Sequence, residues 1–257
     1  RAALLREWLR LKDVQPALQT LKNIERSLFD SLQHCLSCKS CTSSCPLKVD
    51  IPELKSRFLQ SWYQHHRRPL SALFMRNFES LIATAARLPR ISNLLLTSPA
   101  GAKLLQGLSG LGRLPAFSSG PYRHATVWNR SVTQQLLSKQ PAVILLRDNY
   151  LHSFDRPSLQ ACCNILHKLG VRVYLSPLIR NAKLLHVKGY RQEFRKHAYS
   201  VWQQLEEMAA SGLPLLSIET VTRLMTEMEY VDILQRNTSI PVQSIESYLS
   251  VLLRDNT

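Results

Sequence analysis

The sequence predicts a mainly helical protein with an α/β part: a helical domain around four clustered cysteines, followed by a small parallel-sheet βαβ domain. Only 8 of the 257 residues are glycine, which argues against an all-β fold with many tight turns. Apolar residues recur at helical spacing through the first part of the chain, whereas strand-like and helical segments alternate after Pro141. With 45% hydrophobic and 20% charged residues, the composition is that of a globular chain rather than a disordered one.

The first part is predicted to consist of helices. Residues 3–33 and 70–85 carry apolar side chains at helical spacing, namely Leu4, Leu5, Trp8, Leu9, Leu11, Leu18, Leu21, Ile24, Leu28 and Phe29, then Leu70, Leu73, Phe74, Phe78, Leu81, Ile82 and Ala85. Another helix begins at Asp50-Ile51-Pro52-Glu53. Asp50 can cap its end, Glu53 can reach back to the cap, and Pro52 suits the first turn.

Four of the six cysteines lie within eleven residues. Cys35, Cys38, Cys41 and Cys45, followed by Pro46, form the pattern C-x2-C-x2-C-x3-C-P. This spacing lets each thiolate meet a different iron of a compact cluster, and it is typical of bacterial-type [4Fe–4S] proteins. The intervening residues are mostly small, so that backbone N–H groups can approach the cluster sulfurs. We therefore predict that these four cysteines are the metal ligands.

Two alternatives remain open for this run. A zinc site uses two separated C-x2-C pairs, and the third cysteine comes too early for that arrangement, which favours iron–sulfur over zinc. In two-cluster ferredoxins the cysteine before proline serves the other cluster, so the fourth ligand is either Cys45 or a remote thiol. The only other thiols, Cys162 and Cys163, lie at apolar positions of a helical pattern, where buried structural cysteine is expected. Cys45, which is local in the sequence, is the preferred ligand.

A cysteine loop held between helices is typical of an α-helical ferredoxin-like domain, which we place at residues 1–106. Residues 107–140 are predicted to be a linker, because Gly, Pro and Ser gather between Gly107 and Pro121. An α/β domain then occupies residues 141–257.

The α/β domain is predicted from alternating segments. Strands are expected at Ala142–Leu146, Val171–Leu175 and Leu215–Ile218, and helices at 155–170, 190–208 and after Val221. This βαβ succession predicts an open parallel sheet. Neither a G-x-G-x-x-G nor a G-x4-G-K-[ST] motif follows a strand, so the sequence does not support dinucleotide or P-loop phosphate binding.

Charge is distributed unevenly along the chain. Residues 1–140 contain 20 basic and 7 acidic side chains, whereas residues 141–257 contain 13 and 11. Between Leu54 and Gln140 there are 12 basic residues and one acid, Glu79. This first part favours an anionic partner, such as a membrane surface, an acidic protein face or nucleic acid.

Three segments resemble a known family. They are the run from Cys35 to Pro52, the segment Arg67-Arg-Pro-Leu70 and the segment Leu185-His-Val-Lys-Gly-Tyr190. They are similar to the C-terminal iron–sulfur half of bacterial FAD-linked oxidases of the YdiJ type, which are D-2-hydroxyglutarate dehydrogenase-like, and the resemblance covers most of residues 25–230. It implies that a flavin in an N-terminal half takes hydride from a 2-hydroxy acid and that electrons leave through the cluster.

The chain also departs from related proteins. Iron–sulfur halves of glycolate and lactate oxidases often carry Cys-Cys-Gly motifs in the α/β part, but the comparable loops here, residues 178–183 and 218–221, contain no cysteine. We therefore expect no second cluster of that kind. The FAD-binding half is not among these residues, so no catalytic residue and no FAD-binding residue is expected in this chain.

Several other polar groups have both a functional and a simpler structural interpretation. His186, Lys188 and Tyr190 could line a contact or anion site, but a surface turn at Gly189 is the simpler interpretation. The run from His65 to Arg68 could meet phosphate or lipid headgroups, or could be a solvated helix end. His34 could tune the cluster or simply be polar surface. Asp148, Asp155 and His152 have no nucleophile at a useful spacing.

We therefore predict an electron-transfer module whose [4Fe–4S] cluster passes electrons from flavin to a downstream acceptor such as a membrane quinone. The FAD-binding oxidase half would be its partner, on the same polypeptide or on another chain. The alternative is a nucleic-acid- or partner-binding module with a structural cluster. Because the basic stretch contains no recognised nucleic-acid-binding motif, no nucleic-acid partner is expected. A start at Arg1 rather than Met suggests a fragment. The thiols suggest the reducing cytoplasm, where the protein could lie at the inner face of the membrane as a peripheral protein.

Overall fold

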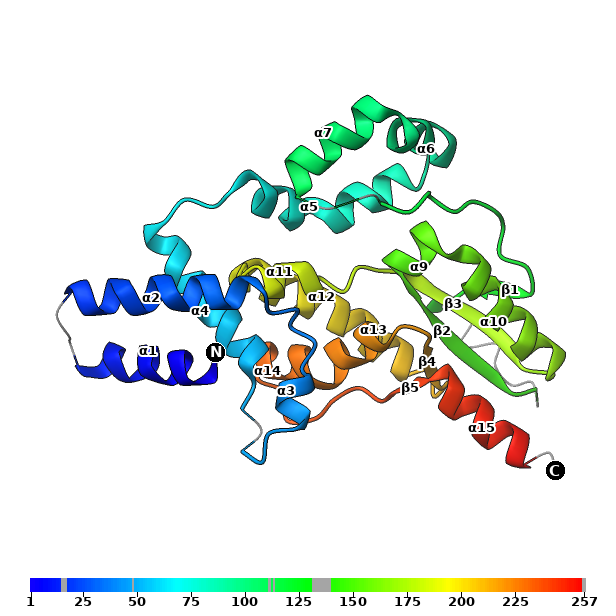
Figure 1. Ribbon diagram of the computed structural model, residues 1–257. Helices are drawn as coiled ribbons and strands as arrows, with labels where there is room; N and C mark the ends of the chain where they lie inside the picture. Colours follow the sequence, from blue (N-terminus) through cyan, green and yellow to red (C-terminus); the bar gives the residue numbers. More distant parts are fainter. Residues whose placement is uncertain (15–17, 48, 111, 113, 131–139, 256–257) are drawn as a thin grey trace. The chain divides into compact units, whose positions relative to one another are not determined.

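The computed structural model describes residues 1–257 except 15–17, 48, 111, 113, 131–139 and 256–257 (Figure 1). The chain divides into two compact units. Unit 1 comprises residues 1–76 and 184–194, and unit 2 comprises residues 77–183 and 195–257. These boundaries differ from the expected division at 1–106, 107–140 and 141–257. The 184–194 segment belongs with the cysteine-bearing helices, and the stretch expected as a linker includes a short strand of the sheet.

Unit 1 is helical, as predicted. Its helices are α1 (Ala2–Val14), α2 (Leu18–Gln33), α3 (Ser40–Ser43), α4 (Ile51–His65) and the start of α5 (Leu70–Ala85), with most of α11 (Lys183–Val187) and the first residues of α12 (Arg191–Ala209). Helices α1 and α2 lie side by side (Figure 1). Their apolar faces meet α4 in a core of Leu5, Trp8, Leu28, Leu32, Ile51, Phe58 and Leu59. Trp8 and Phe58 pack edge to face with ring centroids 5.2 Å apart, so the predicted periodicity forms one buried core.

The predicted start of α4 is confirmed in part. The Asp50 carboxylate accepts a hydrogen bond from the Glu53 amide at 3.0 Å, and Pro52 lies in the first turn. Glu53 does not reach back to the cap as expected. Its carboxylate instead accepts hydrogen bonds from Arg57, His186 and Arg191.

Unit 2 contains a five-stranded parallel sheet in the order β1-β3-β2-β4-β5. The strands are β1 (Ala125–Val127), β2 (Ala142–Asp148), β3 (Arg172–Ile179), β4 (Leu215–Ser217) and β5 (Val242–Ser244). Besides the end of α5 and most of α12, its described helices are α6 (Pro89–Thr97), α7 (Pro99–Ser109), α9 (Asn149–Phe154), α10 (Arg156–Lys168), α13 (Thr220–Leu224), a π-helical turn (Met225–Glu229), α14 (Tyr230–Leu234) and α15 (Ile245–Asp255). The predicted mainly helical fold with a parallel α/β part is confirmed.

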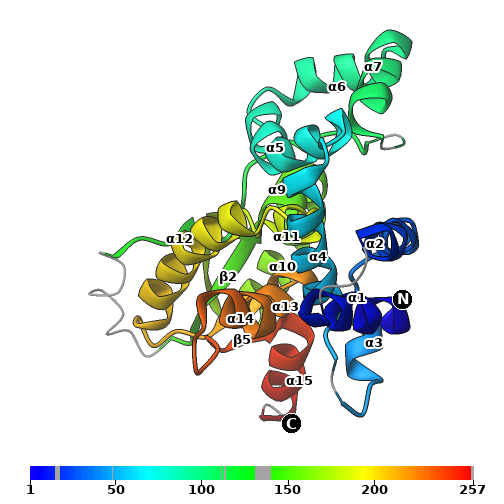
Figure 2. The same cartoon turned by 90° about the vertical axis from the view of Figure 1, so that its left-hand side faces the viewer.

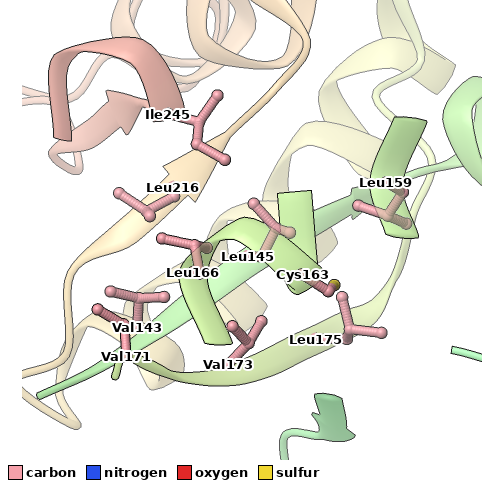
Figure 3. Packing of buried hydrophobic residues seen from close by; sticks show 10 residues of the cluster. All are labelled: Val143, Leu145, Leu159, Cys163, Leu166, Val171, Val173, Leu175, Leu216 and Ile245. Carbon is pink, nitrogen blue, oxygen red and sulfur yellow. The ribbon is translucent and has the colours of Figure 1, made fainter. Parts of the chain in front are cut away.

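The central strand β2 is buried on both faces of the sheet. On one face, Val143, Leu145, Val173, Leu175 and Leu216 pack against α10 and α15 through Leu159, Cys163, Leu166 and Ile245 (Figure 3). The alternate residues of β2, Ile144 and Leu146, are also buried, as expected for a parallel strand covered on both sides. Figure 2 shows α10 and α12 on opposite sides of β2.

Candidate metal centre

The predicted ligands lie on one irregular loop between α2 and α4. Cys35 follows the last turn of α2, where its amide donates to the Leu32 carbonyl at 3.1 Å, and Cys45 follows the short helix α3. Cys38 and Cys41 are exposed, and Cys35 and Cys45 are half-buried. All six cysteines of the chain are reduced thiols rather than disulfides. The four clustered thiols are therefore chemically available as ligands.

Left-handed backbone conformations bend this loop. Ser37 and Lys39 have φ values of 54° and 61°, a region that residues with a side chain adopt infrequently. The two residues flank Cys38, so the backbone bends on both sides of the second thiol. Such conformations persist only where the surroundings stabilise them, and they gather at ligand sites.

Two buried lysines hold the loop. The Lys39 ammonium pairs with Asp50 at 2.8 Å, although only 5% of its side chain is exposed. The Lys55 ammonium, on α4, donates to the Cys35 carbonyl at 2.7 Å, and burial lowers the pKa of Lys55. Both cations thus join the cysteine loop to the start of α4 and place positive charge beside the thiols.

The donor chemistry around the loop fits an anionic sulfide-bearing group. Within the described residues, the buried hydroxyls Ser37 Oγ and Thr42 Oγ1 have no hydrogen-bond partner. Hydroxyl donors, buried cations and four thiols are the groups that stabilise an iron–sulfur cluster. Over the same described residues, however, no three His, Cys, Asp or Glu side chains are gathered closely enough to hold a metal ion.

The remote thiols have a different environment. Cys163 is fully buried in the core of unit 2 (Figure 3), where burial raises the pKa of its thiol to about 12. Cys162 packs against the edge of that core. A buried thiol of this kind is a structural residue, because the thiolate is the metal ligand and is disfavoured there.

The segment 184–194 does not form a plain surface turn. Gly189 does turn the chain, with φ of 71°, but His186 and Tyr190 are only 2% and 5% exposed. The expectation that these polar side chains lie on the surface is therefore wrong. The reason is long-range packing, because the Tyr190 hydroxyl donates to the Ala72 carbonyl at 3.1 Å.

Arg68 links segments 67–70 and 185–190, two of the three segments that resemble the known family. Its guanidinium donates to the carbonyls of Lys188 and Gly189 at 2.8 and 3.0 Å, and it lies 3.8 Å from the centroid of the Tyr190 ring. It also lies over the ring of Tyr63, 4.2 Å from the centroid. Arg68 is therefore a structural residue, whereas its neighbour Arg67 is exposed.

Glu53 joins the start of α4 to segment 184–194, a role that the sequence did not predict. Its carboxylate lies 3.1 Å from His186 Nε2, 2.7 Å from Arg191 Nη1 and 2.8 Å from Arg57 Nε. Burial alone raises the pKa of Glu53, but these hydrogen bonds outweigh it and hold the pKa well below its usual range. A residue of the α4 start thereby anchors segment 184–194, and Lys55 two positions later anchors Cys35.

The remaining candidates have structural roles or lie on the surface. Asp148 and Asp155 cap α9 and α10, accepting from the amides of Tyr150 and Ser158. His152 bonds to the Tyr122 hydroxyl at 2.6 Å, and burial beside Arg156 lowers the pKa of His152 to about 4. His34, His65 and His66 are exposed.

The chain matches curated bacterial proteins named D-2-hydroxyglutarate dehydrogenase. It is 29% identical to the protein of Pseudomonas putida over 265 residues and 29% identical to that of Escherichia coli over 267 residues. The protein of Haemophilus influenzae is 25% identical over 270 residues. No family model matches the chain, and no solved structure matches it.

These matches cover nearly the whole chain but a minor part of each relative. They include 90% of this chain and 26% of the P. putida and E. coli proteins, so the chain spans about a quarter of the length of these relatives. The resemblance stated for the cysteine run and segments 67–70 and 185–190 therefore extends over almost all of the sequence. Over 90% of its length, this chain is homologous to part of the bacterial proteins named D-2-hydroxyglutarate dehydrogenase.

Proposed function

We propose that this chain is the electron-transfer module of an FAD-linked D-2-hydroxy acid dehydrogenase, with a [4Fe–4S] cluster on Cys35, Cys38, Cys41 and Cys45. The observation that carries the proposal is the C-x2-C-x2-C-x3-C-P run on a loop held by two buried lysines. The name shared by the relatives, D-2-hydroxyglutarate dehydrogenase, supports the reaction class.

Each group of the loop has a role in this proposal. The four thiolates bind the irons, Lys39 and Lys55 offset negative charge, and Ser37 and Thr42 supply hydroxyl donors. The bound cluster supplies transfer of one electron at a time. Cys45 is the fourth ligand because it is local to the loop, whereas Cys163 is fixed in the core of unit 2.

Substrate oxidation takes place elsewhere in this proposal. Removing hydride from a 2-hydroxy acid requires an organic cofactor, and this chain has no dinucleotide fingerprint. FAD would therefore be bound by a flavin-binding oxidase part, on the same polypeptide or a partner chain, and a quinone is a suitable acceptor. The reduced thiols suit a cytoplasmic location.

Metal analysis tests the proposal directly. Protein prepared without oxygen should be brown and contain about four iron and four sulfide per chain. Cys38→Ser should lose the iron. The matched control, Cys162→Ser with Cys163→Ala, should keep it, because those thiols lie in the core of unit 2.

Two results would contradict the assignment. Stoichiometric zinc without sulfide would show that the cysteines bind zinc rather than an iron–sulfur cluster. Loss of iron in the control variant would show that Cys162 or Cys163 is a ligand. A cluster that stays oxidised when the flavin-binding oxidase part and substrate are both added, together with salt-dependent DNA binding, would instead favour the binding module with a structural cluster.

A further inference from the structure

Helices α6 and α7 expose an unusual amount of aliphatic surface. None of the described residues of α6 is buried. The exposed residues, here called the α6–α7 surface, are Leu88, Ile91, Leu94, Leu95, Leu104 and Leu108. Their exposed fractions reach 71% at Leu94 and 66% at Leu104, whereas the apolar side chains of a helix face that packs on a core are largely buried.

These residues form stripes on the two helices. Ile91, Leu94 and Leu95 have the i, i+3, i+4 spacing of one helix face, and Leu104 and Leu108 have i, i+4 spacing on α7. Helical geometry places Asn93 on the side of α6 opposite the stripe, and its side chain bonds to the backbone N–H and C=O of Phe117 at 2.6 and 3.0 Å. The apolar stripe therefore points away from the attachment of α6.

The two helices are fixed against each other. They lie next to each other in both Figures 1 and 2. A Cβ added at Gly101 would lie 2.1 Å from the Leu95 carbonyl oxygen, so the absence of a side chain permits close approach of α7 to α6. Ser98 caps α7 by accepting from the Gly101 amide at 3.0 Å.

The charges beside this surface have one sign. Arg87 and Arg90 flank the stripe of α6, Lys103 flanks that of α7, and all three are exposed. The sequence contains no acidic residue between Glu79 and Asp148. An exposed aliphatic stripe bordered only by cations is typical of helices that lie in the interface of an anionic membrane.

We propose that the α6–α7 surface binds the face of an anionic lipid bilayer. Protein interfaces are enriched in aromatic residues, whereas the exposed large residues of this surface are all leucine or isoleucine. With 9 and 11 residues, the two helices suit a position parallel to the membrane plane. Among the described helices, none is long and apolar enough to cross a membrane. This binding does not depend on the cysteine loop.

Sedimentation with lipid vesicles tests the proposal. The 257-residue chain should bind vesicles of phosphatidylcholine mixed with phosphatidylserine more tightly than vesicles of phosphatidylcholine alone, and added salt should weaken that binding. Leu94→Asp with Leu95→Asp should reduce binding to both vesicle types to background. Arg87→Gln with Arg90→Gln should weaken binding to the anionic vesicles by about fivefold per charge.

Matched variants of exposed residues in the same unit serve as controls. Val251→Asp on α15 and Lys196→Gln on α12 should bind like the unchanged chain. Far-ultraviolet circular dichroism establishes that each variant is folded. Equal binding by the Leu94/Leu95 variant, or no preference for anionic vesicles, would overturn the proposal. Leu94-dependent association with a flavin-binding oxidase part, without vesicle binding, would assign the surface to that protein instead.

Discussion

Lys55 is the side chain most directly linked to the backbone of the cysteine loop. It is 6% exposed, and its ammonium donates to the Cys35 carbonyl at 2.7 Å. A cation in a poorly solvated position interacts more strongly with nearby negative charge than one at the surface. Reduction adds one negative charge to a cluster, so a buried ammonium beside it favours the reduced state.

We therefore expect Lys55→Met to lower the midpoint potential of the cluster by tens of millivolts, equivalent to about 1 kcal/mol for one electron. Lys55→Arg should largely retain the potential, and the exposed Lys22→Met on α2 should not change it. A redox titration followed by electron paramagnetic resonance measures the effect. An unchanged potential in Lys55→Met would show that this cation does not act on the cluster, whereas absence of iron from the unchanged chain would refute the cluster itself.

Glu79 is a buried acid near the carboxyl ends of β2 and β3. One carboxylate oxygen accepts from the Ala182 amide at 3.1 Å, while the other, Oε1, and the buried Asn149 Oδ1 have no hydrogen-bond partner within the described residues. Burial, with the Asp148 charge as a smaller cause, raises the pKa of Glu79 to about 7. Protonation converts Oε1 into a donor, so the neutral acid suits this site better than the carboxylate.

This elevated pKa predicts a dependence of stability on pH. The folded chain binds the proton more tightly than the unfolded chain, so the free energy of unfolding should fall as the pH rises from 4.5 to about 7. Glu79→Gln should remove this decrease and stabilise the protein above pH 7 by up to about 3 kcal/mol. Denaturant unfolding at several pH values measures it, with the exposed Glu246→Gln as control. A variant that still loses stability over this range would show that another group titrates.

For individual residues, only contacts between positions close together in the sequence could be predicted. The Asp50 cap could be predicted because Asp50 and Glu53 are three positions apart. The four cysteines are also close in the sequence, so they could be assigned to one loop, but their role as metal ligands stays a prediction. Glu53 meets His186 and Arg191 across 133 and 138 residues, and Arg68 meets Lys188 across 120. No local periodicity encodes such pairs. The resemblance drew attention to segments 67–70 and 185–190 separately but not to their contact.

At the scale of elements, long periodic segments were predicted well and short ones were missed. The predicted strands correspond to β2, β3 and β4, and the helix predicted from Asp155 corresponds to α10. Strands β1 and β5 have three residues each, too few to show an alternating pattern, and β1 lies in the stretch assigned to the linker. Both become strands only because a parallel neighbour, β3 or β4, supplies their hydrogen bonds.

Gly189 determines how closely segment 184–194 packs on α4. A Cβ at this position would lie 2.6 Å from Leu59 Cβ and 2.9 Å from the Gln60 backbone nitrogen, and φ is 71°. We expect Gly189→Ala to destabilise unit 1 by about 3 kcal/mol, from backbone strain and from a clash that backbone atoms cannot relieve. Hydrogen exchange should show lower protection in α4 and in residues 184–194.

Gly212→Ala is the matched control. Its φ of 76° imposes a similar backbone strain, but no heavy atom lies within 4 Å of the added Cβ, so the cost should be about 1 kcal/mol. Similar decreases in the free energy of unfolding for Gly189→Ala and Gly212→Ala would mean that the close approach of residue 189 to Leu59 does not contribute to the cost.

For the whole molecule, the division of the chain into units has a functional consequence. The sequence places the cysteine loop and the sheet in successive domains, but residues 184–194 return to the helical unit, where Glu53 and Arg68 hold them. A cut between residues 106 and 141 would therefore separate the cysteine loop from residues that pack in its own unit. Redox experiments should accordingly use the whole 257-residue chain.

The activity of the 257-residue chain alone is limited by the one-electron chemistry of a cluster. Oxidation of a 2-hydroxy acid removes two electrons, usually as hydride, whereas an iron–sulfur cluster accepts one electron at a time and cannot take hydride. The isolated chain should therefore not oxidise D-2-hydroxyglutarate, D-lactate or glycolate, although its cluster should exchange electrons with a small redox dye. Adding the flavin-binding oxidase part should restore substrate-dependent reduction, measured as a paramagnetic signal, and Cys38→Ser should abolish that signal. Turnover by the isolated chain without flavin would refute the role of the cluster as an electron relay. A cluster that stays oxidised in the presence of the flavin-binding oxidase part and excess substrate would have a structural role only.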